Sequence, residues 1–87
     1  MALTVAIVTD SGAISTGGLV LKALEITPDG GGFEVRILQG TDTTGTELYR
    51  IRASERSEFR YFHEGIQLNG PLYLYFYDGD GAVTVMY

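Results

Sequence analysis

The stretch Leu72–Tyr87, LYLYFYDGDGAVTVMY, decides the fold class. Before its turn, leucine and phenylalanine alternate with three tyrosines, and after the turn two valines alternate with Thr84 and Met86. Alternation with a period of two is the pattern of a β-strand, and Asp78–Gly81 has the composition of a tight turn. The stretch therefore predicts two strands that form a C-terminal β-hairpin with a four-residue loop.

The same alternation recurs upstream of this hairpin. It occurs in Leu3–Thr9, Phe33–Ile37, Tyr49–Ala53 and Phe59–Tyr61. The Leu19–Thr27 segment is less regular and has room for a helical turn, but its β-branched residues and the glycines that follow favour a strand. Gly-rich breaks separate these segments at short intervals, which is typical of a sandwich or barrel.

The size of the chain limits how this pattern can fold. Its 87 residues amount to 9.5 kDa, enough for one domain over residues 1–87. We expect an all-β fold, a single compact antiparallel β-sandwich, jelly-roll-like, of about eight short strands. Folding a chain of this mass hides roughly 63% of its surface, the low end for a stable monomer. Without cysteine there is no disulfide to add stability, so help from a partner subunit is an open alternative.

Charge and composition exclude several classes of partner. The chain has 6 Lys and Arg against 11 Asp and Glu, a net charge of −5, whereas nucleic-acid binding needs a basic surface. Its arginines from Arg50 to Arg60 are interleaved with glutamates. No run of about 18 apolar residues and no signal-peptide pattern occurs. We therefore expect no nucleic acid and no membrane as partner, and synthesis in the cytoplasm.

Candidate catalytic residues are few. A Ser–His–Asp relay would need His63, the only histidine, to meet a serine and an acid such as Asp10. The candidate serines are Ser11, Ser15, Ser54 and Ser57. No Gly-x-Ser-x-Gly elbow is present, and His63 lies where a surface or turn histidine is ordinary. We expect no catalytic residues.

Candidate metal and phosphate sites are equally sparse. Asp78 and Asp80 flank a glycine as in a cation loop, but no oxygen ligands follow them, so we interpret them as turn residues. Gly30–Gly32 precedes a strand rather than the helix that a phosphate site requires. Paired carboxylates for glycoside hydrolysis are available only from acids that we expect to be solvated, Glu55, Glu58 and Glu64. We expect no metal and no cofactor.

The tyrosine row Tyr73, Tyr75 and Tyr77 is the most informative feature of the chain. Its strand already has an apolar opposite face, so both faces need cover. Either another element of the chain covers the second face, or the tyrosines form an interface, since tyrosine combines large contact area with a polar tip. Tyr87, in step with the closing alternation, adds to the second alternative. These four tyrosines are the candidate interface residues.

The order of these segments resembles small virion proteins of tailed bacteriophages, the head-decoration (cement) and tail or fibre accessory β-proteins. The resemblance covers roughly residues 16–87. It lies in these turns and strands: Gly17-Gly18, Leu21–Ile26, Phe33–Ile37, Gly40–Thr46, Leu48–Ile51, Phe59–Phe62, Gly65–Leu74 and the ending Ala82–Tyr87.

The resemblance implies a non-enzymatic structural role. A chain this small and without a stalk favours a capsid decoration protein that bridges and stabilises major capsid subunits. It would act as a homo-oligomer, a dimer or trimer, on the capsid exterior, made in the host cytoplasm. The acidic loops at Asp42, Asp78 and Asp80 would lie on its outer surface.

Two other functions remain open. One is a tail, neck, baseplate or fibre accessory protein. The other is a small carbohydrate-binding adhesion module, in which Tyr61 or the tyrosine row stacks on sugars, although the chain lacks tryptophan. A hydrolase that uses His63 is a third class, with less support from the residues.

Overall fold

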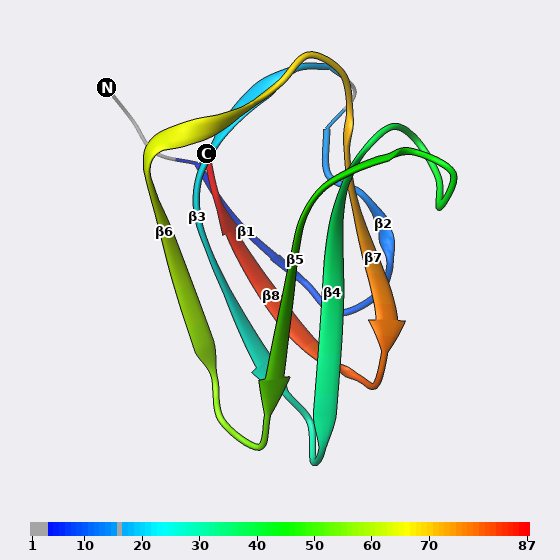
Figure 1. The fold of residues 1–87 in the computed structure, drawn as a ribbon, viewed down its shortest axis with the longest axis vertical. Coiled ribbons are helices and arrows are strands. Elements are labelled where there is room, and N and C mark those ends of the chain that lie inside the picture. Colours follow the sequence, from blue (N-terminus) through cyan, green and yellow to red (C-terminus); the bar gives the residue numbers. More distant parts are fainter. Residues whose placement is uncertain (1–3, 16) are drawn as a thin grey trace.

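The computed structural model describes residues 4–15 and 17–87, and the regular structure of this part of the chain consists of β-strands (Figure 1). None of the described residues lies in a helix that could cross a membrane. The strands are β1 (Val5–Val8), β2 (Gly12–Ala13), β3 (Leu19–Pro28), β4 (Gly32–Gln39), β5 (Thr46–Ser54), β6 (Glu58–Leu68), β7 (Leu72–Asp78) and β8 (Gly81–Met86).

The strands form two four-stranded antiparallel sheets. The first sheet has the order β1-β8-β3-β6 and the second β2-β7-β4-β5. Strand β1 pairs with β8, β2 with β7, β3 with β6 and β4 with β5, as if one long hairpin with its turn between β4 and β5 were wrapped over itself. This winding is that of a jelly roll. The predicted fold class, an all-β antiparallel sandwich of eight strands, is confirmed.

The predicted C-terminal hairpin is wrong, although both of its strands are present. Strand β7 pairs with β2 and β4, whereas β8 pairs with β1 and β3, so the Asp-Gly-Asp-Gly turn passes from one sheet to the other. Alternation shows that each strand has an apolar face to bury, but it does not say which strand lies beside it.

The irregular segment at residues 19–27 is a strand, as predicted. A shift of register between Leu21 and Ala23 interrupts the pairing of β3 with β6. Across this irregularity β3 advances by two residues while β6 advances by five, from Ile66 to Tyr61. The buried side chains of β3 change phase there, from Leu21 to Leu24 and Ile26. The same shift accounts for the broken alternation in the sequence.

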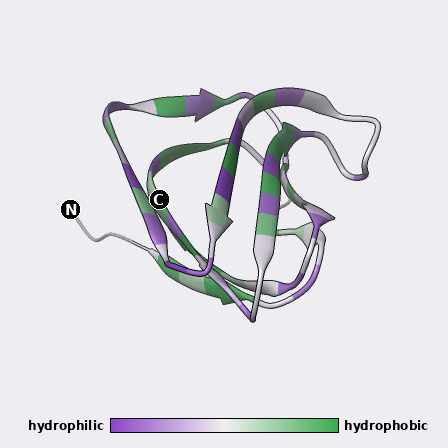
Figure 2. Cartoon of the chain, turned by 60° about the horizontal axis from the view of Figure 1, so that its bottom comes forward, coloured by the Kyte–Doolittle hydropathy of each residue, from purple (hydrophilic) through white to green (hydrophobic). Residues whose placement is uncertain are grey.

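The core lies between the inner faces of the two sheets, and the alternating hydropathy along the strands is visible in Figure 2. Phe33, the largest fully buried side chain, packs edge-on against Phe76 with ring centroids 5.0 Å apart. No polar or charged residue among those described is buried. The core consists of Leu21, Leu24, Ile26, Phe33, Val35, Ile37, Ile51, Ala53, Leu68, Leu72, Leu74, Val83 and Val85.

Candidate interaction surface

Strand β7 places the tyrosine row on the outer face of the second sheet. Leu72 and Leu74 point into the core, so the alternating Tyr73, Tyr75 and Tyr77 point outward. Tyr73 and Tyr75 are half-buried by their neighbours, and Tyr77 is 50% exposed. The structure therefore brings three of the four candidate interface residues together on an outer surface.

Arg36 of β4 packs against Tyr77, the last tyrosine of this row. Its guanidinium carbon lies 3.4 Å from the centroid of the Tyr77 ring, and Tyr77 meets Tyr75 edge-on at 5.8 Å. Arg36 Nε donates to Glu34 at 3.1 Å. Partial burial lowers the pKa of Arg36, but the hydrogen bond and charge of Glu34, with Tyr77 and Glu47 nearby, raise it overall. We call Arg36 with the three tyrosines the tyrosine face.

Ion pairs extend across the rest of this outer surface. Arg52 lies 3.2 Å from Asp78 and 3.5 Å from Glu34, and Arg50 lies 2.9 Å from Glu47. Because the side chains of Arg50 and Arg52 are more than half exposed, each pair contributes little to stability. Their effect is to hold long side chains in place around the tyrosine face.

Tyr87 does not join the tyrosine face. It packs against the core from the first sheet. Its amide donates to the carbonyl of Thr4 at 2.9 Å, and the Thr4 amide donates to the carbonyl of Tyr87 at 2.6 Å. The docking contact that we expected for Tyr87 is therefore made within the chain.

A second surface, which sequence reasoning missed, lies on the outer face of the first sheet. Among the described residues, six large hydrophobic side chains are exposed, and four of them share this face. They are Val5 (57% exposed), Ile7 (71%), Phe59 (51%) and Tyr61 (66%). With Met86 between them, we call these residues the apolar face.

The pairing of β6 explains why its aromatic residues point outward. Leu24 and Ile26 of β3 are fully buried, and their partners on β6 are Arg60 and Glu58. Residues paired across a sheet share a face, so the two charged residues point inward and Phe59 and Tyr61 outward. The sequence does contain one indication of this face. In β1, VAIV, both alternating sets of side chains are apolar, so one apolar set has to lie outside the core, and alternation does not show which.

At the inner side of β6, the charged residues lie along the rim between the sheets. Arg60 Nη1 donates to Glu58 at 3.2 Å. That hydrogen bond raises the pKa of Arg60, with Tyr49 of β5 adding to the effect. Tyr49 in turn packs edge-on against Phe62 at 5.0 Å. An aromatic pair and an ion pair thus occupy this edge of the sandwich.

Three of the four candidate serines make hydrogen bonds within the sandwich. Ser11 Oγ accepts from the Phe76 amide at 2.9 Å, and Ser15 Oγ accepts from the Leu72 amide at 3.2 Å. Ser57 hydrogen-bonds to a threonine of β3. His63 is exposed on β6, and in the described part of the chain no hydrogen bond joins it to a serine.

The candidate acids are also separated. Asp78 pairs with Arg52 on the second sheet, whereas Asp80 lines a cleft with Asp29. Gly30, with φ of 79°, belongs to the turn before β4. Within residues 4–15 and 17–87, no three His, Cys, Asp or Glu side chains come together as a metal site would require.

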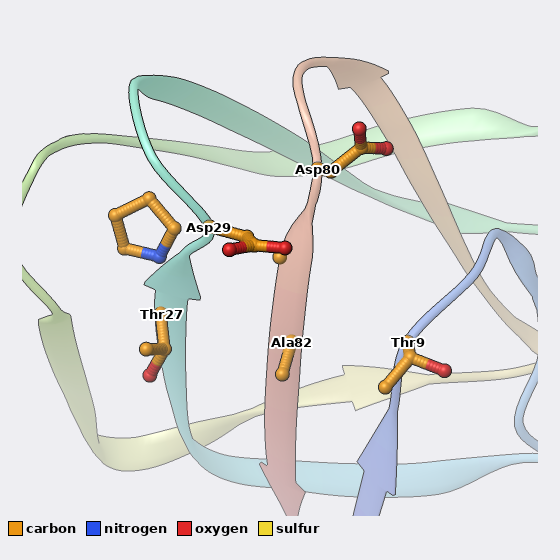
Figure 3. Close-up of a pocket in the computed structure, with 7 residues that line it drawn as sticks. Thr9, Thr27, Asp29, Asp80 and Ala82 are labelled. Atoms are coloured by element: carbon orange, nitrogen blue, oxygen red, sulfur yellow. The ribbon is translucent and has the colours of Figure 1, made fainter.

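The cleft lies where β1, β3 and β8 meet their loops, and it has a volume of about 510 Å³ (Figure 3). Thr9, Thr27 and Ala82 lie across these strand ends, with Asp29 and Asp80 above them in the view. Hydroxyl and carboxylate groups can hydrogen-bond to a small polar molecule. Pro28 and Gly81 complete the lining.

The loop between β4 and β5 supplies a prediction about pH. The Thr44 amide donates to Asp42 Oδ1 at 2.9 Å and the Thr44 hydroxyl donates to the same atom, and these bonds lower the pKa of Asp42 below 3.8. The unfolded chain then binds more protons, so this contribution to stability is present above the ordinary pKa and is lost as pH falls through the folded one.

The measurement is an NMR titration of the Asp42 carboxyl. Thr44→Val removes the hydroxyl donor and retains the amide, so the pKa in that variant should lie between the wild-type value and the ordinary one. A wild-type pKa at or above 3.8 would contradict the prediction.

The geometry thus offers two outer faces with aromatic side chains and an open cleft lined in part by hydroxyl and carboxylate groups. The faces are rigid, because each is built on strands whose other side forms the core. Comparisons with known proteins give no match for this chain, either to a family model, to a curated protein or to a solved structure.

Proposed function

We propose that this protein is a non-catalytic structural subunit of a virion, a decoration protein that binds the capsid lattice of a tailed bacteriophage. The observation that carries the proposal is the tyrosine face, in which Arg36 packs on Tyr77 and Tyr77 on Tyr75, with Tyr73 on the same outer side of β7. Tyrosine and arginine are the residues enriched where proteins bind one another. The jelly-roll winding recurs in viral capsid proteins and lectins, and a fold alone does not decide between them.

The mechanism follows from linkage. A protein that binds only the assembled shell stabilises the assembled state by mass action. The rings of Tyr75 and Tyr77 are ordered before binding, so little side-chain entropy is lost when they dock. Asp42, Asp78 and Asp80 are all exposed. Asp78 pairs with Arg52 beside the tyrosine face, and the loops at Asp42 and Asp80 would supply hydrated acidic surface.

The first test is the copy number in purified particles of the phage that encodes the chain. Quantitative mass spectrometry should find it in a fixed ratio to the major capsid protein, in hundreds of copies. Tens of copies would instead indicate the tail, neck or baseplate. Particles without the chain would contradict a structural role altogether.

The second test asks whether the tyrosine face makes the contact. Tyr77→Ala should weaken cosedimentation with capsids stripped of the protein by at least about tenfold, the effect of losing one interface anchor. Leu48→Ala, at a residue of β5 that is 36% exposed, is the matched control and should bind as the wild type does. Equal binding by both variants would remove the tyrosine face from the interface.

A second candidate function is carbohydrate binding. It is favoured by the cleft, where the hydroxyls of Thr9 and Thr27 and the carboxylate of Asp29 can hydrogen-bond to a sugar. A glycan array probed with wild type and with Asp29→Asn should show signals that the substitution removes. An array without signal would leave only the structural role.

A further inference from the structure

We propose that the apolar face binds a second copy of this chain and forms a two-fold symmetric dimer. This inference does not depend on the virion role, because it rests on the outer surface of the first sheet alone. Four large hydrophobic side chains, from β1 and β6, are between 51% and 71% exposed on that surface.

The pairing registers arrange the face as two rows that cross all four strands. Ala23 is only 4% exposed although it points outward, because Met86 and Tyr61 lie on either side of it. One row is Val5, Met86, Ala23 and Tyr61, and the next is Ile7, Thr84, Glu25 and Phe59. The rows form a continuous surface rather than scattered apolar residues.

The exposed area suits a dimer. With full residue areas of about 150–250 Å², the four most exposed side chains present about 500 Å² in total. The largest apolar patch on a monomer measures about 300–600 Å² and is often functional. A stable interface buries about 800 Å² on each partner, so these four side chains supply more than half of it.

The rows are complementary to themselves under a two-fold axis that runs along the strands between β8 and β3. This axis reverses each row, so Tyr61 lies over the second copy's Val5, and Phe59 over its Ile7. Met86 then lies over the second copy's Ala23. Each contact sets a large side chain against a smaller one, which is how packed sheets interdigitate.

The same axis accounts for the single charge in the rows. Glu25 lies opposite the second copy's Thr84, whose hydroxyl can donate to the carboxylate. A buried carboxylate without a donor would be costly. The other acidic residues lie outside the two rows, so two copies with a net charge of −5 each can meet here without opposing their remaining negative charges.

The oligomeric state tests the proposal directly. Light scattering on a sizing column should give about 19 kDa at high micromolar concentration, twice the chain mass of 9.5 kDa. Ile7→Glu should give 9.5 kDa and remain folded, because Ile7 is 71% exposed. Leu48→Glu, on the other sheet, should remain a dimer. A monomeric wild type, or a dimer that survives Ile7→Glu, would overturn the proposal.

Cross-linking tests the axis. Val5 and Tyr61 lie in one row on opposite edge strands, about 14 Å apart at the usual strand spacing. In the proposed dimer each faces the other's position in the second copy across packed sheets about 10 Å apart, which is too far for a disulfide but within reach of a bis-maleimide linker of about 8 Å. In the cysteine-free background, Val5→Cys/Tyr61→Cys treated with this linker should give a covalent dimer.

Phe59→Cys/Tyr61→Cys is the control, and it links copies only if the axis runs across the strands. A dimer linked by this control alone would refute the axis along the strands. A ladder of higher species would refute a closed dimer.

Discussion

Phe33→Ala should destabilise the protein by about 3–5 kcal/mol, the range for deleting a buried phenylalanine. The Phe33 side chain is fully buried and packs edge-on against Phe76. The backbone of Gly81 also lies against the ring, since a methyl group built on Gly81 would lie 2.8 Å from it. Backbone cannot move in to fill the cavity as a flexible side chain can.

Denaturant unfolding followed by far-UV circular dichroism, at one fixed protein concentration, measures this loss. A chain of this length has a total stability of about 4–13 kcal/mol, so the variant should lose between roughly a quarter and all of it. Phe33→Leu should recover part of the loss, and Leu48→Ala, at the protein surface, should change stability by less than about 1 kcal/mol. A loss below 1 kcal/mol for Phe33→Ala would contradict the packing described above.

Gly79→Ala should cost at least about 3 kcal/mol, whereas Gly30→Ala should cost about 1 kcal/mol. The two glycines have almost the same positive φ, 78° and 79°. They differ in their surroundings: a methyl group on Gly79 would collide with the carbonyl oxygen of Gly32, and one on Gly30 would meet nothing within 4 Å.

The comparison separates backbone strain from steric collision. Both variants lose stability because alanine is strained in a left-handed conformation. In Gly79→Ala the start of β4 must also shift away from the turn between the sheets. The same unfolding measurement applies. Equal losses for the two variants would show that conformation alone decides the cost.

The strands could be predicted from the sequence because alternation records which residues one strand must bury. Pairing could not be predicted in this way. Strands β7 and β8 are joined by a short turn and yet lie in different sheets, because each finds its neighbours among strands far away in the chain. Those neighbours are set by the winding of the whole domain and not by the turn between them.

The same difference separates the two candidate surfaces: one lies on a single strand, and the other spans four strands. Tyr73, Tyr75 and Tyr77 were visible in the sequence because they share one strand. The apolar face was not, because it joins side chains of β1, β8, β3 and β6, from residue 5 to residue 86. Its two edge strands also mislead: in β6 the charged residues, and not the aromatic ones, point inward.

The inward charges of β6 limit how copies of this chain can polymerise. Strand β6 is an open edge of the first sheet and is 11 residues long, a shape that invites edge-to-edge growth into fibres. A copy that extended the sheet there would enclose Glu58 and Arg60 in a lengthening core. Inward charges at an edge oppose such growth, so the β6 edge is protected against extension into amyloid-like sheets.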